Sequence, residues 1–200
     1  MAILAATSGC AHCNPSSDDD AAKDDGVQAG RCGDPYPEQR HTPHILPWRA
    51  GLSFTVGQGN CTDGSHEVGS PDAFAYDIDM PIGTELVAVR AGSVLSVEER
   101  FVDGNRTPGE ENHVDVLHQD GTVAVFYHLT RDGALVAVGE RVSQGQLIGR
   151  SGDTGDSTEP HLHFQVDACR DCGSRPVTFR NTRAHPGGLV EGETYRAETP

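Results

Sequence analysis

The sequence predicts an all-β fold, an antiparallel sandwich or barrel with little helix. From about Ile45 onward, short apolar or alternating runs are separated by Gly, Pro, Asp or Asn, which is typical of strands joined by turns. No twelve-residue window holds the 3.6-residue apolar period of an amphipathic helix. Residues 83–99 and 139–155 echo each other, and each reads as a glycine, a strand, a glycine turn and a second strand. These observations favour a sheet built from repeated hairpins.

Eight runs are the expected strands. Gly57 follows the first of them, Gly92 lies just before the fourth, and the Asp120-Gly121 dipeptide forms a hairpin turn between the fifth and the sixth. In chain order the expected strands cover residues 53–56, 73–78, 85–89, 93–97, 113–117, 122–127, 162–166 and 176–179.

Length and charge limit the function classes. A chain of 200 residues fits one domain with extensions, here expected as a domain over 45–182, an acidic disordered tether and lead-in over 14–44, and a C-terminal extension over 183–200. The formal net charge of −15 argues against nucleic-acid binding. Lys23 is the only lysine and lies in the acidic segment, which excludes a lipoyl or biotinyl carrier. No apolar run approaches the roughly 18 to 20 residues that span a membrane.

The N-terminus leaves two interpretations open. A short apolar run, Ala2 to Ala6, leads into Ser8-Gly9-Cys10, which is similar to the end of a bacterial lipoprotein signal, although Thr7 stands where leucine is usual. Residues 1–13 are then the remnant of a lipoprotein or secretory signal, which implies export to the periplasm or cell envelope with a lipid on Cys10. The alternative is an ordinary N-terminus without a targeting role.

Six cysteines are present, and their pairing cannot be read from the sequence. Cys169-Arg-Asp-Cys172 fits a redox pair, half of a zinc knuckle or a local disulfide. Export would favour disulfides. The six lie at positions 10, 13, 32, 61, 169 and 172.

Two histidines on either side of one leucine suggest a metal site. Successive side chains of a strand point to opposite faces, so His161 and His163 share a face. Alone, such a pair is more often a solvated surface feature. His66, Asp77 and His128 are further candidates, and catalytic zinc usually takes three protein ligands and keeps a fourth position for water. Two histidines and one aspartate would give a site of net charge +1, which helps to acidify that water.

With these residues the chain resembles a known family, the lysostaphin-type zinc metallopeptidases or LytM domains. The resemblance covers roughly residues 45–182 in five successive segments. They are LPWRAGLSFTVGQGN, SHEVGSPDAFAYDIDMPIGTELVAVRAGSV, HVDVLHQDGTVAVFYHL, VSQGQLIGRSGDTGDSTEPHLHFQV and SRPVTFRNT.

The resemblance implies a half-barrel fold and an activity. By position, His66, Asp77 and His163 match the ligands of one zinc ion. His161 matches the general base that activates the attacking water, and His128 the second catalytic histidine, a donor to the oxyanion. The implied function is a monomeric zinc endopeptidase that hydrolyses peptide cross-links of bacterial peptidoglycan with a metal-activated water.

Departures from the family pattern keep alternatives open. Ten residues separate His66 from Asp77, where the common form has the two ligands four apart, so Asp63 and Asp72 are substitutes for His66. Glu159 stands where glycine is common, and its side chain is expected to narrow the substrate groove. One rival function is a LytM-like non-catalytic module that activates other wall hydrolases. Another, a histidine phosphocarrier, would need neither Asp77 nor export.

Overall fold

The computed structural model describes residues 29–200. The expected signal remnant, Lys23 and residues 14–28 of the tether therefore lie outside the described residues. Within residues 29–200 the chain forms eleven strands and one short 3-10 helix, η1 (Gln39–His41). The all-β prediction is confirmed. No helix within that range is long and apolar enough to cross a membrane.

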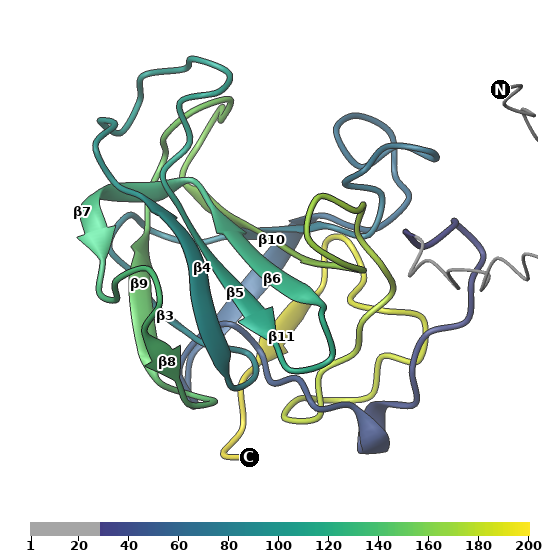
Figure 1. Cartoon of the computed structure of the whole chain (residues 1–200). Coiled ribbons are helices and arrows are strands. Elements are labelled where there is room, and N and C mark those ends of the chain that lie inside the picture. The colour runs from purple at the N-terminus through teal and green to yellow at the C-terminus, as the bar shows by residue number, and fades with distance from the viewer. Residues whose placement is uncertain (1–28) are drawn as a thin grey trace, which may run out of the picture.

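The strands form two antiparallel sheets (Figure 1). The large sheet has the order β11-β1-β2-β10-β6-β5-β4-β8, and the small one the order β3-β9-β7. The strands are β1 (Ser53–Gln58), β2 (Tyr76–Asp79), β3 (Glu85–Val87), β4 (Gly92–Glu98), β5 (His113–His118), β6 (Val123–Tyr127), β7 (Leu129–Ala134), β8 (Arg141–Val142), β9 (Leu147–Ser151), β10 (His161–Asp167) and β11 (Thr194–Arg196).

Alternation along β10 divides the central strand into two faces. Leu162, Phe164 and Val166 are at most 1% exposed and belong to the apolar core. Phe164 packs edge-on against Phe126 of β6, with the ring centroids 5.2 Å apart. Burying such a side chain contributes roughly 1.5–3 kcal/mol. The polar residues at the alternate positions are thereby fixed on the opposite face of the sheet.

The two echoing segments pair with each other in a crossed manner. β3 from the first segment pairs with β9 from the second, with Glu85 opposite Arg150. β4 from the first pairs with β8 from the second, with Gly92 opposite Val142. The similarity of residues 83–99 and 139–155 therefore reflects two matched halves that together link the sheets.

The structure differs from the eight predicted strands in several places, and β8, β9 and β11 are not among those eight. Residues 176–179 form no strand, although Val177 and Phe179 are buried in the core, so their apolar character reflects packing rather than pairing. Residues 73–75 form a turn before β2 begins at Tyr76. β7 is not among the predicted strands, because Thr130, Arg131 and Asp132 interrupt its apolar pattern.

Both chain segments that flank the expected domain pack against it. The predicted disorder of the tether is wrong from residue 29 onward: Gly30 N–H donates to Ser174 O at 2.8 Å, and Cys32 forms a disulfide with Cys61. Residues 183–200 are not a separate extension, since β11 pairs with β1 along the edge of the large sheet. The two cysteines of the CxxC motif, Cys169 and Cys172, also form a disulfide with each other.

Candidate metal centre

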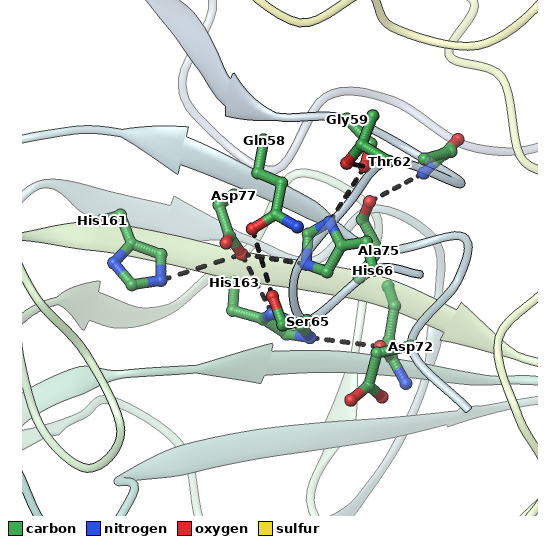
Figure 2. Close-up of polar contacts among 12 residues, drawn as sticks. Gln58, Gly59, Thr62, Ser65, His66, Asp72, Ala75, Asp77, His161 and His163 are labelled. Atoms are coloured by element: carbon green, nitrogen blue, oxygen red, sulfur yellow. Dashed lines mark hydrogen bonds and ion pairs between the residues drawn. The ribbon is translucent and has the colours of Figure 1, made fainter. Parts of the chain in front are cut away.

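Three side chains converge on one point of the large sheet (Figure 2). Asp77 on β2 and His163 on β10 are direct register partners, so the two side chains emerge on the same face. Asp77 Oδ1 lies 3.0 Å from His163 Nδ1 and 3.4 Å from His66 Nε2. All three potential ligand atoms lie within 4.8 Å of one another. Within residues 29–200 no other such group of three histidine, cysteine or carboxylate ligands occurs.

His66 reaches this point because the segment between β1 and β2 folds back on itself. Cys61 N–H donates to Ala73 O at 2.7 Å, and Asn60 Nδ2 donates to Ala75 O at 2.7 Å. These bonds close the long interval between His66 and Asp77 and leave His66 fully buried. The substitutes considered for His66 do not join the group: Asp63 is exposed, and Asp72 lines the cavity in front of the site.

Hydrogen bonds on the far side of each ring hold the histidine protons away from this point. His66 Nδ1 lies 3.0 Å from Gly59 O, and His163 Nε2 lies 3.1 Å from Gln165 Oε1. Carbonyl oxygens only accept, so these ring nitrogens carry the protons. When His163 Nδ1 gives up the proton that it donates to Asp77, the lone pairs of His66 Nε2 and His163 Nδ1 face Asp77. His66 Nε2 is buried without a hydrogen-bond partner.

The charges of the cluster suit a cation. Burial acts to raise the pKa of Asp77, but its hydrogen bond with His163 and the adjacent imidazole of His66 hold it well below its usual range. Burial acts to lower the pKa of His163, but its hydrogen bond and attraction to Asp77 raise it. An ionised carboxylate facing two imidazole lone pairs is a donor set that fits zinc. His66 Nε2 is buried without a hydrogen-bond partner, and a metal ion bound beside it would supply a partner.

Two more histidines stand beside the cluster. His161 Nε2 lies 3.7 Å from Asp77 Oδ1, and the His161 and His128 ring centroids are 4.5 Å apart. His128 follows β6 directly and has a φ of 64°, a left-handed conformation that costs energy in a residue other than glycine. Surrounding structure holds it there: His128 Nδ1 donates to Thr154 O at 2.6 Å.

The surroundings of His128 favour its neutral form. Burial, together with repulsion from His161 and His163, lowers the pKa of His128 to about 4, so its ring is neutral near pH 7. Because Nδ1 holds the proton for Thr154, Nε2 presents a lone pair. His161 is arranged in the same way, with Nδ1 donating to Glu159 O at 2.8 Å. In both rings Nδ1 is thus engaged with a backbone carbonyl, and Nε2 is the nitrogen that is turned away from it.

A cavity of about 480 Å³ opens over these groups. Asp77, His128, His161 and His163 line it, together with acidic residues, among them Asp72, Glu111 and Asp156. Glu159, which was expected to narrow the groove with its side chain, is not part of the lining and acts through its carbonyl oxygen instead. A second cavity of about 430 Å³ shares Asp72 and Tyr127 with the first.

Sequence reasoning missed the groups that fix the rings. Gln165 had a readable signal, since it lies two residues beyond His163 on the same face of β10. The carbonyl oxygens of Gly59, Thr154 and Glu159 had none, because backbone groups leave no trace in the residue pattern.

Comparisons with known proteins cover most of the residues that form this site. The family described as peptidase family M23 matches residues 73–177, a range that includes Asp77, His128, His161 and His163 but not His66. The glycyl-glycine endopeptidase ALE-1 of Staphylococcus capitis is 32% identical over 129 residues, which cover 64% of this chain and 33% of ALE-1. The peptidoglycan DD-endopeptidase ShyA of Vibrio cholerae is 36% identical over 90 residues, covering 45% of this chain and 19% of ShyA.

A solved structure supports the fold. Pseudoalterin, described as an M23 metalloprotease from the deep sea, aligns with a TM-score of 0.53 over 80% of this chain and 98% of that one, at 17% identity. The chain spans a third or less of the length of the two curated relatives named above. Because the family match covers more than half of the 200 residues, and the resemblance read from the sequence is thereby confirmed, the chain belongs to peptidase family M23.

Proposed function

We propose that the protein is a zinc-dependent endopeptidase that hydrolyses peptide cross-links of bacterial peptidoglycan. The observation that carries the proposal is the convergence of His66 Nε2, Asp77 Oδ1 and His163 Nδ1, with the histidine protons held on the opposite nitrogens. These three atoms would be the ligands of one zinc ion. Zinc bound there supplies Lewis acidity, which lowers the pKa of a water towards 7 and polarises a peptide carbonyl.

The two neighbouring histidines, His161 and His128, would accept and donate protons during the reaction. His161 Nε2 is nearest to the ligand cluster and is the proposed general base, with its ring fixed by the Glu159 carbonyl. Neutral His128 cannot donate a hydrogen bond through Nε2 at the start of the reaction. After a proton reaches Nε2, the imidazolium can stabilise an oxyanion, so donation by His128 follows proton transfer.

The substrate class rests on the relatives. Among the matched proteins are a glycyl-glycine endopeptidase and a peptidoglycan DD-endopeptidase; both names indicate endopeptidases, and the second names peptidoglycan. Such a substrate implies export to the periplasm or cell envelope. A lipid on Cys10 remains part of this proposal, as does a monomeric state.

The test is digestion of isolated cell wall by the purified full chain, with and without chelator. We expect new amino termini to appear, to vanish with chelator and to return when zinc is added. Protein with His163→Ala should be folded, bind no zinc and release nothing. A wild-type protein that binds no zinc and digests nothing, yet stimulates another wall hydrolase, would establish the non-catalytic alternative instead.

A further inference from the structure

A line of polar side chains continues from the metal centre along β10. His163, Gln165 and Asp167 occupy alternate positions and therefore share the face opposite the apolar core. His163 Nε2 lies 3.1 Å from Gln165 Oε1, and Gln165 Nε2 lies 2.7 Å from Asp167 Oδ1. Gln165 is only 5% exposed, so solvent offers its amide few other partners.

The hydrogen bonds along this line all run in one direction, from His163 through Gln165 to Asp167. The NH₂ end of the Gln165 amide donates to Asp167 Oδ1, which suits the carboxylate form of Asp167, an acceptor only. The amide oxygen is then turned towards His163, which must donate from Nε2. With a proton held on Nε2, His163 can give up the Nδ1 proton that it donates to Asp77 at 3.0 Å and offer the Nδ1 lone pair to a metal ion. A reversed amide would place a donor against Nε2 and move the ring proton to Nδ1.

We propose that Gln165 and Asp167 are positioning residues that hold the His163 ring in the orientation needed for metal binding, with Nε2 towards Gln165 and Nδ1 towards Asp77. The inference rests on the proposed zinc centre and extends it to two residues that touch neither metal nor substrate. Hydrogen-bond partners that orient a ligand histidine typically affect metal affinity by about 10- to 100-fold. Asp167 acts through Gln165, so its removal should cost less than removal of the Gln165 amide.

Three substitutions test the contributions of Gln165 and Asp167 separately. Gln165→Met keeps the length of the side chain but removes the acceptor, and we expect zinc affinity, measured by competition with a chelator, to fall about 10- to 100-fold. Gln165→Glu restores an acceptor for His163 and should recover most of this loss. Asp167→Asn permits both directions of the Gln165 amide and should give a smaller loss than Gln165→Met. Burial raises the pKa of Asp167 to about 7, so pH 8 keeps its carboxylate ionised.

Asp115→Asn is the matched control. Asp115 lines the same second cavity as Asp167 and is also partly buried, but it makes no hydrogen bond to Gln165 within the described part of the chain. The same loss of one carboxylate at position 115 should leave zinc affinity nearly unchanged. An equal loss in both variants would show that the local charge, and not the hydrogen-bonded line, governs affinity.

A spectroscopic measurement distinguishes positioning from a general structural effect. In zinc-loaded, ¹⁵N-labelled protein, the Nε2–H proton of His163 should be protected from exchange with water in the wild type and in Gln165→Glu. In Gln165→Met the protection should be lost. Unchanged zinc affinity and unchanged protection in Gln165→Met would overturn the inference, whereas a wild type that binds no zinc would overturn the proposed function itself.

Discussion

Two groups of buried histidines lie on opposite faces of the large sheet, and only one of them has the character of a metal site. At the metal centre, His66 and His163 lie against the ionised carboxylate of Asp77. On the core-facing side, His44 and His118 have ring centroids 5.6 Å apart, and the Nε2 atom of each is buried without a hydrogen-bond partner. Burial and unpartnered nitrogens are common to both groups.

The difference between the two groups is the charge beside the rings. Burial lowers the pKa of His44 to about 3 and that of His118 to about 4, and Arg90 adds repulsion in both cases. Asp120 opposes this effect but is itself hydrogen-bonded to Arg90. At the metal centre Asp77 instead raises the pKa of His163. A carboxylate without an arginine partner among the described residues therefore distinguishes the proposed cation site from the neutral pair His44 and His118.

Removal of that carboxylate should have the largest effect. Asp77→Asn keeps the shape of the side chain but removes its charge. We expect loss of zinc binding that exceeds the about 10- to 100-fold cost of outer hydrogen-bond changes, together with loss of hydrolysis. Metal content after dialysis is the measurement. Asp79→Asn, the same change two residues further along β2, is the control and should retain zinc.

Removal of the proposed base, His161, should reduce catalysis without reducing zinc binding. His161→Ala removes a proton acceptor but no ligand, so kcat should fall by about 10²- to 10⁴-fold while zinc affinity stays nearly unchanged. Kinetics on a short cell-wall peptide and chelator competition report the two quantities. A parallel loss of zinc would assign His161 to the ligand set. His113→Ala, in the neighbouring cavity, is the control and should keep activity.

The His44–His118 pair should make the fold sensitive to acid. In the unfolded chain both rings bind protons below about pH 6.5, whereas the folded protein keeps them neutral down to about pH 4. The free energy of unfolding should therefore fall as the pH drops from about 6.5 to about 4, by on the order of 3 kcal/mol for His118. Urea unfolding of metal-free protein at several pH values measures this. His118→Leu should flatten the curve, and an unchanged slope would contradict the assignment.

The smallest effect is expected at a buried histidine that the backbone satisfies completely. His185 Nε2 accepts from Phe179 N–H at 2.9 Å, and Nδ1 donates to Arg183 O at 2.8 Å. His185→Asn should cost about 1–3 kcal/mol of stability by leaving a buried N–H without its acceptor. Thermal unfolding measures the cost. Zinc content should not change, since the residue has no part in the metal centre.

The sequence predicted the parts of the fold that depend on alternation and glycine turns. The strand character of β5 and β10, and the shared face of His161 and His163, follow from a two-residue period. Residues 29–44 and β11 were misjudged, because their order depends on a disulfide and on pairing with β1 rather than on their own composition. The closeness of His66 to Asp77 was predicted only through family resemblance, because a folded-back loop leaves no periodic signal.

The crossed pairing of the two echoing segments also bears on how the protein is made. β3 and β4 cannot find their partners β9 and β8 until the chain has been synthesised beyond Ser151, and β10 then inserts between β2 and β6. Folding dominated by such distant pairings is slow. His163 is the last of the three proposed ligands to leave the ribosome. Metal uptake should therefore be a late event in the maturation of the chain, and a zinc-loaded molecule would be one whose sheet is already complete.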